Sequence, residues 1–189
     1  MLVEDNADVR RGVAAVLNAT EDLQVCAEAA TVAEAGPMAL AIAPDVVIVD
    51  LRLPDGSGVE AGRDVRAAQP DIRVLLLTSA SEEDALVASV LTGASGFLVK
   101  QLLGDDLVAT VRALAEGETL IDLTDFTALA PVQRRLATCG PEEAHLVSLV
   151  VSGLTDVQIA QEYGVPAVQV RERVASVLDR MGAGRTARR

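Results

Sequence analysis

The fold of this chain is decided by residues 46–58, which read VVIVDLRLPDGSG. Four consecutive apolar residues open the stretch, and a short unbroken apolar run is typical of a strand that is buried on both faces of a parallel sheet. The run ends at Asp50, and a turn containing Pro54 and Gly56 follows it. The stretch therefore predicts a buried strand with a carboxylate at its carboxyl end.

Similar short apolar runs punctuate the first part of the chain. They are Leu2-Val3, Val74–Leu77, Phe97–Val99 and a weaker run at Leu23–Cys26. Apolar residues recur at helical spacing between the runs, and Ser81 followed by three acids is typical of a helix N-cap. Strands that alternate with amphipathic helices predict an α/β fold, in which a doubly wound parallel sheet has helices on both faces.

The charge of the 189-residue chain is unevenly distributed. The formal net charge of −12 argues against a general binder of polyanions. However, residues 1–118 contain eight basic and 20 acidic side chains, whereas residues 119–189 contain eight of each. The acidic excess thus belongs to the first part, and the charge of the second part does not forbid binding to nucleic acid.

Composition and patterning exclude several classes of protein. Hydrophobic residues make up 50% of the chain, which excludes a wholly disordered protein. No apolar run approaches the roughly 20 residues that span a bilayer, and the N-terminus lacks the layout of a signal peptide. Cys26 and Cys139 match no metal or disulfide framework, so we expect reduced thiols. We therefore expect a cytoplasmic protein that does not bind membranes.

Polar side chains end the predicted strands. Glu4 and Asp5 follow the first run, and Asp50, Thr78 and Lys100 end later ones. The carboxyl ends of parallel strands meet at one edge of the sheet, where ligands bind. Three carboxylates at one edge favour a divalent cation, and Mg2+ prefers carboxylate oxygens and water. An aspartate beside such an ion can attack phosphorus and form an aspartyl phosphate.

Lys100 is the only lysine, since the other 15 basic residues are all arginine. A compact ammonium on a flexible stem is not interchangeable with a planar guanidinium. This contrast suggests that the position requires a lysine, with the ammonium binding phosphoryl oxygens.

Taken in order, these motifs resemble the receiver domain of bacterial two-component response regulators. The matching segments are Val3–Asn6, Val49–Gly58, Leu77–Ala80 and Gly96–Lys100. The resemblance implies that residues 1–118 form a five-stranded sheet of flavodoxin-like strand order. Only three residues precede Glu4, so we expect a weak first strand, and Pro37 falls within the expected second helix.

The resemblance also implies a role for each polar residue of the site. Asp50 is then the phosphoacceptor. Asp5, Asp50 and the backbone carbonyl of Arg52 bind Mg2+, and Glu4 helps through water. Thr78 holds a phosphoryl oxygen, Phe97 is the aromatic side chain that moves with it, and Lys100 pairs with the phosphate. We therefore expect a sensor histidine kinase as a partner.

An enzyme of the haloacid-dehalogenase type is the alternative reading of a nucleophilic aspartate after a strand. Such phosphatases need a second acid two residues further on as the general acid. Arg52 occupies that position. We therefore set the enzyme aside and expect a regulator.

The segment from residue 138 to residue 189 has helical spacing of apolar residues. Pro141-x-Glu143, Gly153–Thr155, Ile159-Ala160 and the stripe Val170, Val174, Val177, Leu178 and Met181 resemble a LuxR-type helix-turn-helix. A generic three-helix packing unit is the plainer alternative. Fusion to a receiver, through a linker at residues 119–137 that includes a short helix, resembles the NarL/FixJ regulators. The resemblance implies a phosphorylation-controlled transcriptional regulator that binds promoter DNA and forms a homodimer when active.

The last helix of this pattern is the expected recognition helix. With its apolar stripe buried, we expect the DNA-facing residues to be Gln169, Arg171, Glu172, Arg173, Ala175 and Arg180. Arg171 is the best candidate for a base contact, because arginine pairs with guanine. The tail residues Arg185, Arg188 and Arg189 are candidates for phosphate contacts.

Acidic residues support an alternative function for the second part. Glu172 and Asp179 share the exposed face of the predicted recognition helix and repel DNA phosphates. In this alternative, the receiver is functional but the helix-turn-helix acts through protein contacts and binds DNA weakly or not at all.

Overall fold

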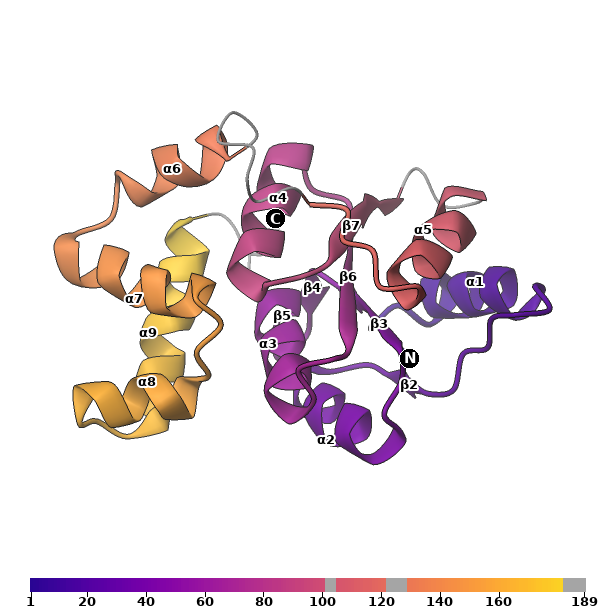
Figure 1. Cartoon of the computed structure of the whole chain (residues 1–189), viewed down its shortest axis with the longest axis horizontal. Coiled ribbons are helices and arrows are strands. Elements are labelled where there is room, and N and C mark those ends of the chain that lie inside the picture. Colours follow the sequence, from indigo (N-terminus) through magenta and orange to yellow (C-terminus); the bar gives the residue numbers. More distant parts are fainter. Residues whose placement is uncertain (101–104, 122–128, 182–189) are drawn as a thin grey trace.

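The computed structural model describes residues 1–100, 105–121 and 129–181. Five parallel strands form one sheet, in the order β2-β1-β3-β6-β7 (Figure 1). The strands are β1 (Leu2–Val3), β2 (Glu28–Ala29), β3 (Val46–Asp50), β6 (Arg73–Thr78) and β7 (Gly96–Val99). This confirms the predicted doubly wound sheet and its flavodoxin-like order.

The prediction of a strand at Leu23–Cys26 is wrong. Residues 23–26 do not form a strand, and the edge strand β2 lies at Glu28–Ala29. Only two residue pairs join it to β1, which itself has two residues as expected. The side chains of Leu23 and Val25 instead pack against the hydrophobic cluster that contains Leu2 of β1.

Helices cover both faces of the sheet (Figure 1). Helices α1 (Ala7–Asn18) and α5 (Asp105–Ala115) share a hydrophobic cluster with Leu75 and Leu77 of β6. Leu76 of the same strand belongs to a second cluster, formed with α2 (Val32–Ile42), α3 (Gly58–Ala68) and α4 (Glu82–Thr92). Neighbouring residues of β6 thus face opposite sides, which is why an unbroken apolar run marks a strand covered on both faces.

Local signals fix where the helices begin. The Ser81 hydroxyl accepts from the Asp84 amide and caps α4, as the sequence predicts. Ser57 and Glu60 form a reciprocal capping box at α3. This cap follows a small hairpin of β4 (Arg52–Leu53) and β5 (Gly56–Ser57), which continues from the carboxyl end of β3. Pro37 lies inside α2, as expected.

The second part of the chain is helical. It consists of α6 (Ala130–Leu136), α7 (Pro141–Val151), α8 (Asp156–Tyr163) and α9 (Ala167–Arg180). The predicted apolar stripe of α9 is buried from Val170 to Met181. Thr155 caps α8, and Gly164 ends it with a φ of 65°, a left-handed conformation that glycine adopts without strain.

The helical part packs against the receiver side of the molecule through α4. Helix α4 contacts both α6 and α7 (Figure 1). Val87 and Leu91 of α4 belong to the same hydrophobic cluster as Val132 of α6 and Val147 of α7. Within the described residues, no helix is both long and apolar enough to cross a bilayer.

Candidate functional site

Three carboxylates meet at the carboxyl edge of the sheet. One oxygen each of Glu4, Asp5 and Asp50 lies within 4.8 Å of the others. They come together because β1 and β3 are parallel neighbours whose carboxyl ends coincide. Glu4 and Asp50 are buried, with exposed fractions of 1% and 6%, whereas Asp5 faces solvent.

Lys100 enters this cluster from the end of β7. Its Nζ atom lies 2.6 Å from Glu4 Oε2 and 3.1 Å from Asp50 Oδ2. The single ammonium thus contacts both buried carboxylates at once. The structure therefore brings the only lysine of the chain to the site where the sequence predicts it.

The single ammonium of Lys100 does not fully offset the cost of burying these carboxylates in their charged form. Burial raises the pKa of Asp50, the Lys100 ammonium lowers it, and the Asp5 carboxylate raises it further, with a net upward shift. Burial likewise raises the pKa of Glu4 despite the hydrogen bond from Lys100. A cluster that resists ionisation and offers only hard oxygen donors fits a divalent cation such as Mg2+.

Thr78 is placed one residue beyond the point where β6 pairs with Asp50. Asp50 pairs in register with Leu77, and the buried Thr78 hydroxyl accepts from the Ala80 amide at 2.9 Å. Phe97, on the neighbouring strand β7, is half-buried and packs against the cluster that contains α4.

The Arg52 side chain makes a contact that the sequence did not predict. It is exposed and donates to the Ser79 hydroxyl, the residue after Thr78. The sequence suggested only its backbone carbonyl as a ligand. No periodicity or motif signals that a β4 side chain bridges to the loop after β6.

Binding of Mg2+ to the carboxylate cluster is expected to raise the melting temperature. An ion at about ten times its dissociation constant stabilises the native state by about 1.4 kcal/mol. For a chain of this size, that free energy corresponds to about 3–6 °C, measurable by calorimetry with and without Mg2+. Asp5→Asn removes one ligand and should reduce the shift, whereas Asp8→Asn, three residues further on and exposed, should keep it. Equal shifts in both variants would exclude the cluster as the site.

The residues predicted to face DNA all lie on α9, outside its buried stripe. Gln169, Arg171, Glu172, Arg173 and Arg180 are exposed, and Ala175 is half-buried. The Arg180 guanidinium contacts Glu143 of α7 and lies 3.1 Å from the Ser176 hydroxyl. Arg180 is thus held by its own helical domain.

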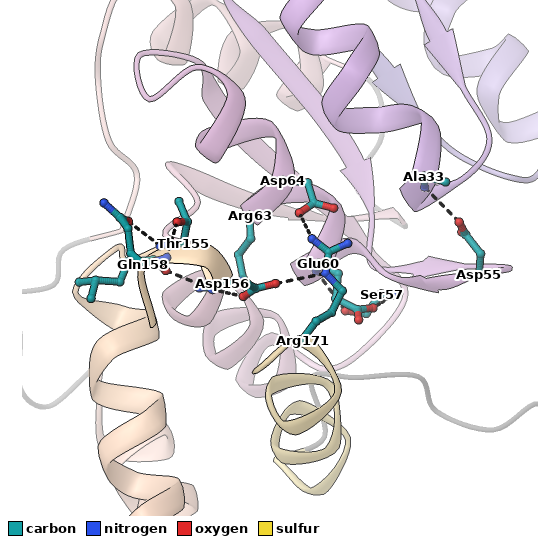
Figure 2. A network of polar contacts seen from close by, with 11 residues as sticks. Ala33, Asp55, Ser57, Glu60, Arg63, Asp64, Thr155, Asp156, Gln158 and Arg171 are labelled. Atoms are coloured by element: carbon teal, nitrogen blue, oxygen red, sulfur yellow. Dashed lines mark hydrogen bonds and ion pairs between the residues drawn. The ribbon is translucent and has the colours of Figure 1, made fainter. Parts of the chain in front are cut away.

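Arg171 does not point freely into solvent. Its Nη2 atom lies 2.8 Å from Asp64 Oδ1 on α3, and its Nε atom lies 3.2 Å from Asp156 Oδ2 on α8. Figure 2 shows the guanidinium between these two carboxylates. Since Asp64 is 107 residues away in sequence, no local pattern predicts this contact.

Arg63 completes a network of charges between α3 and the helical part. Its Nη2 atom lies 2.9 Å from Asp156 Oδ1 and 3.2 Å from the Leu154 carbonyl oxygen (Figure 2). The side chains of Arg63 and Asp156 are only 10% and 14% exposed. An open cavity of about 450 Å³ adjoins this network, between α3 and the N-terminus of α8.

Comparison with known proteins agrees with this geometry. Residues 1–112 match the response regulator receiver domain. The DNA-binding transcriptional activator DevR/DosR of Mycobacterium tuberculosis is 37% identical over 191 residues, covering 97% of this chain and 88% of that protein.

Solved structures give the same assignment. A LuxR-family two-component response regulator from Aurantimonas sp. SI85-9A1 matches with a TM-score of 0.62 and 29% identity, over 71% of this chain and 96% of that one. The signal receiver domain of NarL from Mycobacterium tuberculosis matches with a TM-score of 0.58 and 30% identity, over 62% of this chain and 94% of that one. The chain therefore belongs to the two-component response regulators of the NarL/FixJ family, in which a receiver domain is followed by a LuxR-type helix-turn-helix.

Proposed function

We propose that this regulator accepts a phosphoryl group on Asp50 and in response binds promoter DNA. The observation that carries the proposal is the convergence of Glu4, Asp50 and Lys100 at the carboxyl edge of the sheet. A buried carboxylate beside one ammonium and two further acids is arranged for phosphoryl transfer, which depends on positioning and electrostatics.

In the transfer step, a carboxylate oxygen of Asp50 attacks the phosphorus of a phosphohistidine on a sensor kinase. The new O–P bond forms as the P–N bond breaks, and the histidine nitrogen leaves with the electron pair and takes a proton. Asp5, Asp50 and the Arg52 carbonyl, with help from Glu4, would hold Mg2+, which would supply positive charge for the phosphoryl oxygens.

Three residues of this chain then hold the phosphorylated state. Lys100 is already 3.1 Å from Asp50 Oδ2, so its ammonium pairs with a phosphoryl oxygen after only a small movement. The Thr78 hydroxyl donates to another oxygen, and Phe97 repacks as Thr78 moves. Phosphorylation thereby biases an equilibrium between two arrangements of the β6–α4 region.

Helix α9 is the proposed recognition helix of a helix-turn-helix at residues 138–189. Residues 1–118 are the receiver in this division, and residues 119–137 are the linker. The proposed DNA contacts are made by Gln169, Arg171, Glu172, Arg173, Ala175 and Arg180, with Arg171 as the base contact. The proposed tail contacts Arg185, Arg188 and Arg189 lie outside the described residues.

The interdomain charges supply a control mechanism for this activity. While Arg171 pairs with Asp64 and Asp156, its guanidinium is occupied by carboxylates and does not reach a base. Release of α9 from α3 removes the contact of Arg171 with Asp64 and leaves it only Asp156, a carboxylate of its own domain. The active form is a homodimer on promoter DNA. The site of action is the cytoplasm, and the protein is a regulator rather than an enzyme.

A second function is favoured by the acids on the same face. Glu172 and Asp179 are exposed on α9, and both oppose contact with DNA phosphates. In that case the helical domain acts through protein contacts, and phosphorylation controls a protein partner.

Salt-dependent binding to a fluorescent duplex of random sequence separates the two functions. The full chain is titrated with and without acetyl phosphate and Mg2+, over a series of salt concentrations. The affinity of a DNA-binding regulator falls steeply as the salt concentration rises. Its basic side chains displace counterions from the DNA phosphates, and added salt opposes that release. Absence of binding at low salt in both states, with phosphoryl incorporation verified by mass, would leave only the protein-contact function.

A further inference from the structure

One arginine of the linker helix joins the receiver to the end of α9. Arg135 in α6 donates from Nη1 to the backbone carbonyl of Met181, the C-cap residue of α9. Its Nη2 atom contacts the carboxylate of Asp84 in the first turn of α4. The Arg135 side chain is only 22% exposed, so both contacts are partly shielded from water. The planar guanidinium therefore holds three elements in one fixed geometry.

Asp84 is connected to the switch residue Thr78 by a short series of hydrogen bonds. The Ser81 hydroxyl donates to Asp84 Oδ2 at 2.8 Å and accepts from the Asp84 amide at 3.2 Å. The residue before Ser81 is Ala80, whose amide donates to the Thr78 hydroxyl at 2.9 Å. These hydrogen bonds and the peptide bond between Ala80 and Ser81 together connect Thr78 to the first turn of α4.

The position of Thr78 therefore affects the contact that Arg135 makes. When the Thr78 hydroxyl turns towards a phosphoryl oxygen, the Ala80 amide has to follow it or lose its acceptor. When the amide follows the hydroxyl, the backbone of Ala80 moves and displaces Ser81 and Asp84 at the start of α4. Hydrogen bonds weaken steeply with distance and angle, so one rigid guanidinium does not keep both partners after such a displacement.

We propose that Arg135 is a positioning residue that transmits the phosphorylation state of Asp50 to helix α9. It holds the C-terminal end of α9 while Asp84 keeps its present position, and it releases that end when the start of α4 moves. A cation is also favoured at the C-terminal end of a helix, where carbonyl groups accumulate negative potential. This inference rests on the proposed function, in which Asp50 accepts the phosphoryl group.

The neighbouring arginine is a matched control. Arg134 lies next to Arg135 in α6, and its Nη2 atom lies 3.2 Å from Glu83 Oε1. Its side chain is 63% exposed. Arg134 thus shares the charge, the helix and the contact with α4, but among the described residues it forms no hydrogen bond or ion pair with α9.

Hydrogen–deuterium exchange of the α9 amides in the full chain tests the proposal. In the wild type, acetyl phosphate with Mg2+ should speed exchange at residues 167–180 by about fivefold or more, the lower end of typical coupling between sites. In Arg135→Ala, exchange of the α9 amides should be fast even without the phosphodonor. The ratio of the exchange rates with and without the phosphodonor should therefore fall towards one. Arg135→Lys should behave like Arg135→Ala, because lysine lacks the two Nη atoms that contact Met181 and Asp84 separately. Arg134→Ala should behave like the wild type.

The outcomes separate this inference from the proposed function. An Arg135→Ala protein that keeps the wild-type ratio would overturn the inference, as would equal α9 exchange in unphosphorylated Arg135→Ala and Arg134→Ala. Absence of phosphoryl incorporation in the wild type, measured by mass, would overturn the proposed function instead. Exchange of α2 and α3 amides reports whether a variant is folded. If Arg135→Ala is unfolded, Asp84→Ala removes the receiver side of the same link, and unchanged α9 exchange in that variant would overturn the inference.

Discussion

Asp50→Asn is expected to abolish phosphoryl incorporation from acetyl phosphate in the presence of Mg2+. An amide oxygen is not a nucleophile towards phosphorus, so the loss should be complete within detection, as measured by intact-protein mass. The variant keeps the shape of the side chain at the end of β3 and removes a charge that burial disfavours. We therefore expect it to fold and to melt at or above the wild-type temperature without Mg2+.

The matched control for this variant is an aspartate at the other end of the same strand. Asp45 immediately precedes β3, at the opposite edge of the sheet, and its side chain is exposed. Asp45→Asn makes the same chemical change and should leave incorporation unchanged. Incorporation that persists in Asp50→Asn would disprove Asp50 as the acceptor, and mapping the modified peptide would then distinguish Asp5 from Glu4.

The site was predictable because it depends on a rule about sheets rather than on side-chain detail. Apolar runs locate the strands, and the carboxyl ends of parallel strands lie at one edge. Glu4, Asp50 and Lys100 follow three such runs, and the structure brings them into contact. Their chemical roles remain predictions.

What sequence reasoning missed depends on interactions between distant segments. Strand β2 has only two pairs with β1, so its register is decided by the neighbouring strand and not by the apolar run before it. Arg171 was predicted to face DNA from α9, but its guanidinium lies between two carboxylates. The carboxylate it meets on α3 was not predictable, because Asp64 lies 107 residues away in sequence.

The contact between α3 and the helical domain is suited to reversible opening. Arg63 and Asp156 are almost buried, and the cost of removing their charges from water offsets much of their attraction. Burial also raises the pKa of Asp64, despite the nearby Arg171 guanidinium that lowers it. An interface whose polar contacts are nearly balanced by desolvation is shifted by a small change elsewhere, such as a movement of α4.

A double variant in the receiver, Arg63→Ala with Asp64→Ala, is therefore expected to bind DNA without phosphorylation. It removes both α3 side chains that hold α8 and α9 (Figure 2) and leaves the net charge unchanged. Unphosphorylated affinity for duplex DNA should rise by about tenfold, which corresponds to about 1.4 kcal/mol. The slope of log affinity against log salt should steepen by about one, since Arg171 then keeps only the exposed side of its contact with Asp156 and exchanges that carboxylate for a DNA phosphate.

The control for this prediction is a second charge-neutral pair. Asp8 and Arg11 form an exposed ion pair on α1, with side chains 85% and 71% exposed. Asp8→Ala with Arg11→Ala changes composition and charge in the same way but leaves the contacts of α3 with α8 and α9 intact, so affinity should not change. Because Arg63 and Asp64 belong to the receiver, a gain confined to the first double variant would reflect release of α9 rather than a new DNA contact. Equal affinity in both double variants would show that the contact with α3 does not restrain DNA binding.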